Sequence, residues 1–368
     1  MAALPMPRPD LAGLGWDERL RLLFATHAAA GHVPGRVVTE DRGSYGVLTG
    51  LAELRATLSG RFRFEADDPT EPSHPAVGDW VAIQAAGGSG AGVIRAVLPR
   101  RSAIVRRAPG DRGVDAQVIA ANVDVAFLVT SLNAEFNVRR LERYVAVAWE
   151  SGALPVILLS KSDIATDAQG ARLAAEAAAP GVPVVVVSAV TGEGLDEVRA
   201  HVQPGRTVVF VGSSGVGKST LVNAIAGAPL LSTAGIREDD ARGRHTTSRR
   251  QLVPLVGGLL IDTPGMRELG LHDGDGLGAA FGDLERVAAT CRFGDCRHDS
   301  EPGCAVRVAL ESGGLDPARL SAFRKLEREA RRAELSTDAL ARRAERRRWT
   351  AISRSVERHM QQKYGGER

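Results

Sequence analysis

Two short segments carry residues suited to binding nucleotide phosphates and a magnesium ion. The first is a glycine-rich loop, Gly212-Ser213-Ser214-Gly215-Val216-Gly217-Lys218-Ser219, followed by Thr220. Backbone N–H groups of such a loop and of the helix behind it converge on phosphate oxygens, Lys218 reaches the β and γ phosphates, and the Ser219 hydroxyl binds Mg²⁺. The second is Asp262-Thr263-Pro264-Gly265. Its Asp262 carboxylate is placed to bind Mg²⁺, and its Gly265 N–H to meet the γ phosphate.

A polar segment between these two, Gly243-Arg244-His245-Thr246-Thr247, corresponds to the place where nucleotide switches carry a Mg²⁺-binding threonine. Thr246 and Thr247 are both candidates for that role. The position that often holds a water-orienting glutamine, directly after the Asp-x-x-Gly box, is Met266. We therefore expect slow intrinsic hydrolysis, with His245 as the candidate to orient water. The alternative is that His245 is an exposed loop histidine.

A base-reading segment, Ser160-Lys161-Ser162-Asp163, follows an apolar run. A carboxylate there accepts hydrogen bonds from the N1 and N2 donors of guanine, while the lysine stem lies along the base; adenine lacks that donor pair. Ser188-Ala189 ends a later apolar run and places the Ala189 N–H where guanine O6 needs a donor. The common box has asparagine where this chain has Ser160, so we expect guanine preference to survive through Asp163, with affinity the open question.

The order of these segments is rotated. The base-reading residues at 160–163 and 188–189 precede the phosphate loop, whereas they follow it in the usual guanine-nucleotide switch. The two γ-phosphate segments are consequently followed almost directly by the last part of the chain. We therefore hypothesise that the nucleotide state is transmitted to the C-terminal part of the chain, because little chain lies between this part and the γ-phosphate segments.

The elements that must position these residues are apolar strands alternating with helices. The pattern predicts helices over Val138–Ser151 and Lys218–Ala226, and a mostly parallel sheet covered on both faces. The predicted strands are Val125–Thr130, Pro155–Leu159, Val184–Val187, Val208–Val211, Gln251–Leu255 and Leu259–Ile261.

The region before this α/β part has a different pattern. After a helical lead-in at 11–33, short β-like runs are separated by turn residues. The predicted strands are Arg36–Thr39, Tyr45–Leu48, Ala56–Phe64, Asp79–Ile83 and Gly92–Leu98. About five short strands favour a small OB-like β-barrel. Arginines cluster here and suggest an RNA-binding face, with a solvated surface as the alternative: Arg36, Arg42, Arg61, Arg63, Arg95, Arg100, Arg101, Arg106 and Arg107.

All three cysteines of the chain lie in one short segment with a histidine, Cys291-x4-Cys296-x-His298-x5-Cys304. Three thiolates and one imidazole form a closed tetrahedral set suited to structural Zn²⁺. We expect one zinc ion that folds a small helical C-terminal domain. The basic tail beyond it, with Arg342, Arg343 and Arg346–Arg348, is either a solvated helix or an RNA-gripping arm.

Length and composition limit the number of domains and the class of protein. The chain has 368 residues, of which 44% are hydrophobic and 25% charged, with a formal net charge of +3. It is long enough for two or three globular domains, and no apolar run approaches the roughly 20 residues that span a bilayer. The N-terminus lacks the features of a secretory signal. We expect a cytoplasmic monomer with no membrane contact.

The order SKSD, SAV, GSSGVGKST, GRHTT, DTPG resembles that of the circularly permuted GTPases. The flanking pieces, Pro99-Arg100-Arg101-Ser102 and the cysteine segment, resemble the RsgA (YjeQ) family of small ribosomal subunit biogenesis GTPases from about residue 35 to 335. The resemblance implies binding of the 30S subunit and its 16S rRNA near the decoding region, GTP hydrolysis there, and release as the subunit matures; it also supports His245. Ser160 departs from the family's usual asparagine.

Together these observations predict a multidomain α/β protein. The expected parts are a lead-in at 1–34, an OB-like barrel at 35–105, a circularly permuted P-loop GTPase domain at 119–272, a zinc-binding helical domain at 273–335 and a basic tail at 336–368. We expect a GTPase that forms GDP and phosphate and is stimulated by the small subunit. The alternatives are an RNA-binding scaffold that hydrolyses little, which Met266 favours, and an ATP-using P-loop enzyme, which Asp163 and Ala189 disfavour.

Overall fold

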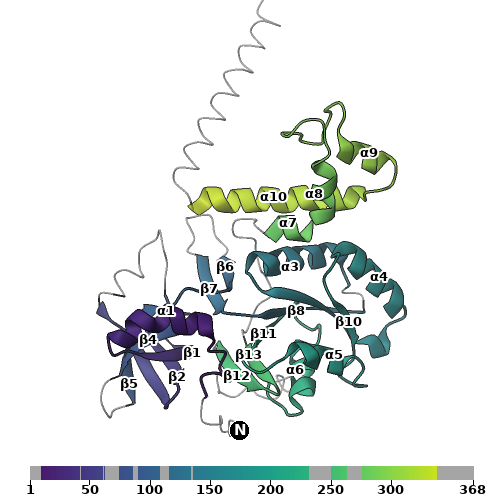
Figure 1. Ribbon diagram of the computed structural model, residues 1–368. Helices are drawn as coiled ribbons and strands as arrows, with labels where there is room; N and C mark the ends of the chain where they lie inside the picture. Colours follow the sequence, from purple (N-terminus) through teal and green to yellow (C-terminus); the bar gives the residue numbers. More distant parts are fainter. Residues whose placement is uncertain are drawn as a thin grey trace, which may run out of the picture.

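The computed structural model describes residues 10–41, 43–60, 62, 74–85, 90–107, 116–133, 136–231, 250–262 and 276–337. Figure 1 shows a small β-barrel beside an α/β domain, with a group of helices lying above the α/β domain. This arrangement confirms the predicted fold class. In the part of the chain that the structure describes, no helix is both long and apolar enough to cross a membrane.

The barrel is closed by five strands. They are β1 (Val33–Asp41), β2 (Ser44–Thr49), β3 (Glu53–Leu58), β4 (Trp80–Ala85) and β5 (Ala91–Val97). They pair in the order β1-β2-β3-β5-β4, and β4 closes back on β1. Inward side chains such as Val37, Val47 and Ile83 are completely buried and fill the interior. The third strand begins and ends earlier than the predicted Ala56–Phe64, because the chain leaves the sheet at Ser59, where the Ser59 hydroxyl accepts the Phe62 N–H.

The α/β domain has a six-stranded sheet in the order β10-β9-β8-β11-β13-β12, parallel except for β12. Its strands are β8 (Val125–Ser131), β9 (Leu154–Ser160), β10 (Val184–Val187), β11 (Thr207–Val211), β12 (Gln251–Leu255) and β13 (Gly258–Asp262). Its helices are α3 (Val138–Glu150), α4 (Ala168–Ala178), α5 (Leu195–His201), α6 (Lys218–Ala226) and the 3-10 turn η1 (Ser162–Ile164).

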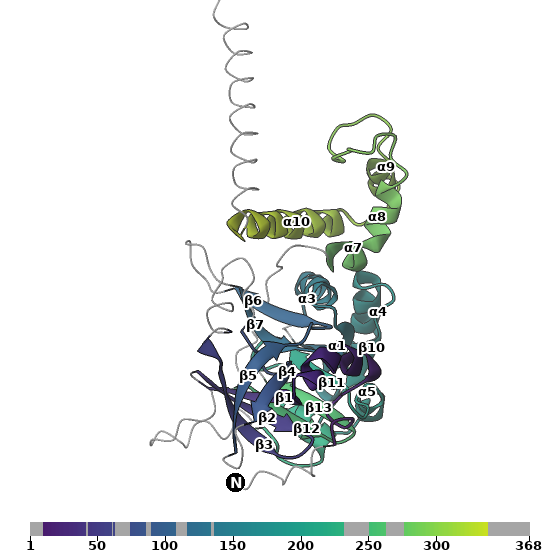
Figure 2. The ribbon, with the colours of Figure 1, turned by 60° about the vertical axis from the view of Figure 1, so that its left-hand side comes forward.

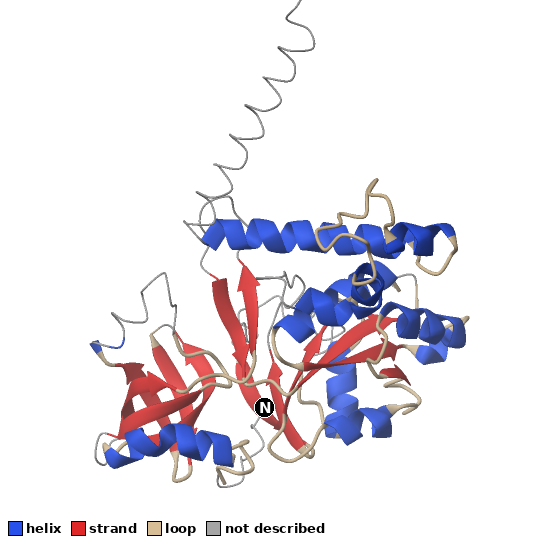
Figure 3. Ribbon diagram, turned by 45° about the horizontal axis from the view of Figure 1, so that its top comes forward, coloured by secondary structure: helices blue, strands red, loops and turns tan. Residues whose placement is uncertain are grey.

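Alternate strand residues explain why both faces of this sheet are covered. Ala126 and Leu128 of β8 pack on the side of α3 and α4, whereas Phe127 and Val129 pack on the side of α5 and α6. Figure 3 shows helices on both sides of the strands. The near-continuous apolar strands of the sequence therefore have two buried faces, as predicted.

Two features join the barrel to the α/β domain, and the sequence patterns indicated neither. Strand β1 pairs with β12 at Thr39 and Gln251, which makes one continuous sheet of eleven strands. A separate hairpin of β6 (Ala103–Arg107) and β7 (Ala116–Ala121) stands between the two parts, as Figure 3 shows.

Arg36 lies at the same junction and is completely buried rather than part of an RNA-binding face. Its guanidinium donates to the carbonyl oxygens of Leu14 and Gly78 and, at 2.7 Å, to the hydroxyl of Thr207 on β11. It also lies over the Trp80 ring, 5.5 Å from the centroid. Burial lowers the pKa of Arg36 to about 10, so the group stays charged at neutral pH.

Arg100 also lies at this junction, with its side chain 18% exposed. It pairs with the buried Asp79 carboxylate at 2.7 Å. Arg101 bridges Asp17 and Asp124. Among the predicted basic residues, Arg95 is exposed, whereas Arg42, Arg61 and Arg63 and the side chains of Arg106 and Arg107 lie outside the described residues.

The helical parts complete the fold. The lead-in forms α1 (Glu18–Ala29), capped by the Asp17 carboxylate, which accepts the Leu20 N–H. The last part forms α7 (Gly276–Ala280), α8 (Gly282–Ala288), α9 (Ala305–Glu311) and α10 (Pro317–Thr337). Figures 1 and 2 both show α10 lying across the top of the α/β domain, near α3. The basic tail from 338 onward lies outside the described residues.

Candidate functional site

The predicted phosphate loop connects β11 to α6, so it lies at the carboxyl edge of the parallel sheet. Gly212 has no room for a side chain, because a Cβ there would be 2.3 Å from the Val129 carbonyl oxygen, and Gly217 has a φ of 93°. Helix α6 begins at Lys218, directly after that turn. The Lys218 ammonium donates to the carbonyl oxygens of Gly212 and Ser213 at 2.8 and 2.6 Å. This geometry presents the helix N-terminus and a lysine at the loop, as phosphate binding needs.

Asp262 ends β13, which is the neighbour of β11 in the sheet. The carboxylate is therefore at the same edge as the phosphate loop. Burial raises the pKa of Asp262, and the nearby Lys218 charge counteracts this shift. Ser219 lies in the first turn of α6 and is half-buried. A carboxylate and a hydroxyl at one edge, both hard oxygen ligands, fit Mg²⁺.

The predicted γ-phosphate residues His245, Thr246, Thr247 and Gly265 lie outside the described residues, as does Met266. Their roles stay predictions.

The base-reading segment lies against the phosphate loop. The buried Ser160 hydroxyl donates to the Val216 carbonyl oxygen of that loop at 2.7 Å. Lys161, with a left-handed φ of 62°, places its Cε 4.0 Å from the position that a Cβ on Gly217 would occupy. The Ser160 hydroxyl thus connects the two segments through a direct hydrogen bond, although asparagine is more common at this position.

Asp163 and the end of β10 also meet. The Ser188 hydroxyl donates to the Asp163 carboxylate at 2.6 Å, and Ala189 follows directly. Strands β9 and β10 are parallel neighbours, with Val187 opposite Ser160, so the two predicted base contacts share one edge.

One residue at this site had no signal in the sequence. Arg140, in the first turn of α3, donates to the Ser213 hydroxyl of the phosphate loop at 2.8 Å. An arginine in an amphipathic helix is ordinary, and only the packing of α3 beside the loop reveals the contact.

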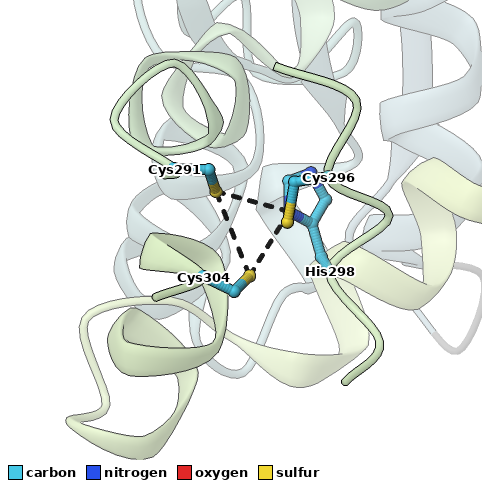
Figure 4. Close-up of side chains that lie close together, drawn as sticks. All are labelled: Cys291, Cys296, His298 and Cys304. Carbon is cyan, nitrogen blue, oxygen red and sulfur yellow. Dashed lines mark hydrogen bonds between the residues drawn. The ribbon is translucent and has the colours of Figure 1, made fainter. Parts of the chain in front are cut away.

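A second site lies among the C-terminal helices. The ligand atoms of Cys291, Cys296, His298 and Cys304 are all within 4.8 Å of one another. The His298 Nδ1 atom is 3.6 Å from the Cys291 sulfur and 3.5 Å from the Cys304 sulfur. Figure 4 shows the four side chains converging from the segment between α8 and α9 and from the start of α9.

The donor set of this cluster fits a metal ion. Three thiols and one imidazole are ligands that zinc and other soft or borderline divalent ions accept. Four protein ligands around one point are typical of structural metal sites, which complete their coordination without substrate. The cluster is therefore suited to holding the segment between α8 and α9 in place rather than to catalysis.

The sheet order and the converging segments define the class of protein. Strands β8, β9 and β10 precede the phosphate loop in the chain yet complete the sheet around it, and β9 and β10 lead into the predicted base-reading residues. The solved structure of YloQ, described as a circularly permuted GTPase, matches with a TM-score of 0.57 at 26% identity, covering 81% of this chain and 95% of that one. The fold and site are those of a circularly permuted GTPase.

Comparisons with other chains give the family. The RsgA GTPase family model matches residues 97–272. The small ribosomal subunit biogenesis GTPase RsgA of Streptomyces coelicolor is 45% identical over 367 residues, which cover 97% of each chain. The crystal structure of YjeQ from Thermotoga maritima matches with a TM-score of 0.60 at 26% identity over 81% of this chain and 98% of that one. This chain belongs to the RsgA family of GTPases.

Proposed function

We propose that this protein hydrolyses GTP to GDP and phosphate and acts as a late assembly factor of the 30S ribosomal subunit. The observation that carries the enzymatic part is the meeting of the phosphate loop, Asp262 and the base-reading residues at one edge of one sheet. The ribosomal part rests on the relatives, which are named for small ribosomal subunit biogenesis.

In the proposed reaction, Lys218 and the N–H groups of the loop bind the β and γ phosphates. Ser219 and Asp262, with Thr246 or Thr247, would hold Mg²⁺, which neutralises phosphate charge when bound. Asp163 and the Ala189 N–H select guanine. His245 would orient the attacking water in place of a glutamine. Replacing His245 by alanine should lower the stimulated rate while nucleotide affinity stays nearly unchanged, and an unaltered rate would exclude this role.

The metal cluster is proposed to hold one structural zinc ion. Three thiolates and one imidazole are the soft and borderline ligands that zinc prefers. For the RNA partner, we propose 16S rRNA near the decoding region, contacted through exposed cations that include Arg95. We further propose that the chain is a cytoplasmic monomer with domains at the limits predicted from the sequence.

The central experiment measures phosphate release from GTP and from ATP, with and without purified small subunits. The expected result is that phosphate is released from GTP but not from ATP, and that small subunits strongly increase this rate. A chain that binds GTP and subunits but releases no phosphate is the scaffold that Met266 favours. Release from ATP at an equal rate would contradict the proposed base selection.

Base selection has a sharper test in Asp163→Asn. Xanthine carries a carbonyl at C2 where guanine has an amine, so an amide at this position should weaken GDP binding at least tenfold and favour xanthosine diphosphate. The matched control is Asp196→Asn, the same change at a 97% exposed carboxylate on α5. Unchanged GDP affinity in Asp163→Asn would show that Asp163 does not read the base.

A further inference from the structure

Ser213 of the phosphate loop is held by two cations from different elements. The Lys218 ammonium donates to its carbonyl oxygen at 2.6 Å, and the Arg140 guanidinium donates to its hydroxyl at 2.8 Å. Lys218 belongs to the loop itself, whereas Arg140 comes from α3. The conformation of the loop at Ser213 therefore depends on where α3 lies.

Arg140 is well fixed at its own end. The Asn137 side chain caps α3 and accepts the Arg140 backbone N–H at 3.0 Å. Buried residues along α3, among them Leu141 and Val145, pack the helix against the sheet. A displacement of Ser213 is therefore passed to the helix through a short, restrained connection.

Other side chains of α3 contact the C-terminal helices. Arg139 donates to the Asp316 carboxylate at 2.8 Å, just before α10. Arg143 pairs with Glu329, further along α10, with one contact at 2.7 Å. The buried Glu142 carboxylate accepts from Arg319 of α10 at 3.0 Å. One helix of 13 residues thus contacts the phosphate loop and two separate points of α10.

The backbone packing on this side is also close. A Cβ on Gly276 of α7 would lie 2.0 Å from the Ala146 carbonyl oxygen of α3, so only glycine allows the two helices to approach this far. Figures 1 and 2 show α7 and α10 above α3 in both views. Because close-packed helices shift as rigid bodies rather than deform, movement of α3 must be accommodated by α7 and α10.

We propose that Arg140 is a positioning residue of the phosphate loop, and that α3 couples the nucleotide bound in that loop to the placement of α10. This proposal rests on the proposed function, since it needs a nucleotide in the loop. It adds a route that does not pass through the chain connection after residue 262. By linkage, contacts made by α10 alter nucleotide affinity to the same degree that the nucleotide alters α10.

The test is amide hydrogen exchange of the full chain, saturated either with GDP or with the non-hydrolysable analogue guanosine 5′-(β,γ-imido)triphosphate. Exchange in α10 should differ between the two nucleotides in the wild-type protein. In Arg140→Ala that difference should disappear, and GDP affinity should fall about tenfold through loss of one charged hydrogen bond. Arg140→Lys should restore most of both effects. The control is Arg172→Ala on α4, whose side chain pairs with Glu176 on the surface.

A second variant tests the coupling from its other end. Arg143→Ala removes the contact with Glu329 without touching the loop, and it should change the GDP dissociation rate severalfold if the coupling is reciprocal. If the wild-type chain binds GTP but α10 exchanges identically with both nucleotides, the coupling is wrong while the proposed function stands. An exchange difference that persists in Arg140→Ala overturns the role of Arg140. A chain that binds neither nucleotide overturns both proposals.

Discussion

Replacing Arg319 by methionine should undock α10 from the α/β domain at a cost of about 3 kcal/mol. The Arg319 side chain is 7% exposed. It donates to Glu142 of α3 at 3.0 Å, to Asp283 of α8 at 2.6 Å, and to the carbonyl oxygens of Ala178 and Ala280 at 2.8 and 3.0 Å. It also lies over the Phe281 ring, 4.7 Å from the centroid. A single side chain therefore joins α10 to the ends of α4 and α7 and to α3 and α8.

The expected free-energy cost follows from the buried carboxylate that loses its arginine partner. The Glu142 side chain is 1% exposed, and removing one partner of a buried ion pair costs about 3 to 5 kcal/mol because the remaining charge is uncompensated. The lower end of this energy range applies, because Arg139 still contacts Glu142 at 2.7 Å and the Asp283 side chain is 30% exposed to water. About 3 kcal/mol corresponds to a change of more than a hundredfold in the docking equilibrium.

Limited tryptic cleavage after Arg324 or Lys325 in α10 measures this equilibrium, because slow cleavage reports the population of the open form. Cleavage should be about a hundredfold faster in Arg319→Met than in the wild-type protein. Arg328→Met, an exposed residue of the same helix, is the control. In the double variant Arg319→Met with Glu142→Gln, much of the loss should be recovered, because the stranded charge is gone. A rise below about fivefold, or no recovery in the double variant, would refute the argument.

Three further predictions concern the two sites. Removing zinc with a chelator should speed hydrogen exchange at 291–304 while GDP binding is retained; loss of GDP binding at the same metal depletion would contradict separate roles. Ser160→Ala should weaken GDP binding about tenfold in equilibrium titration, because the Val216 carbonyl loses its partner; Ser160→Thr should keep the affinity, and Ser162→Ala, at a half-buried serine whose hydroxyl donates to Glu193 and not to the phosphate loop, is the control. Because burial raises the pKa of Asp262, its ionisation opposes folding, and the stability that its protonated form contributes is lost as pH rises through the folded pKa. Asp262→Asn should therefore raise the thermal midpoint of the metal-free protein more at neutral pH than at a pH below the ordinary carboxyl pKa of 3.8, while it abolishes Mg²⁺-dependent hydrolysis; an equal effect at both pH values would contradict the shift.

Local sequence patterns were sufficient to predict much of the fold. Helix α6 begins and ends where the sequence predicted, at Lys218 and Ala226, because a glycine turn and an apolar face are properties of neighbouring residues. The five barrel strands were found, but the third was placed too late, since apolar and basic residues alternate again after Ser59 and Gly60, whereas the pairing with β5 ends at Leu58. The basic cluster was the weakest inference. The charge of a residue does not reveal its burial: Arg36 is buried, and Arg100 is half-buried in an ion pair with the buried Asp79.

The sequence by itself determined the chemistry of this protein and the rotated order of its segments. Residue types at fixed short spacings predict a phosphate loop, a guanine-reading box and a Cys₃His cluster, independently of the rest of the chain. Tertiary structure alone decided how these parts are joined. Arg36 meets Thr207 across 171 positions, Arg319 meets Glu142 across 177, and Arg140 meets Ser213 across 73. Such contacts depend on the packing of whole helices and sheets, which leaves no periodic or local trace in the residues that make them.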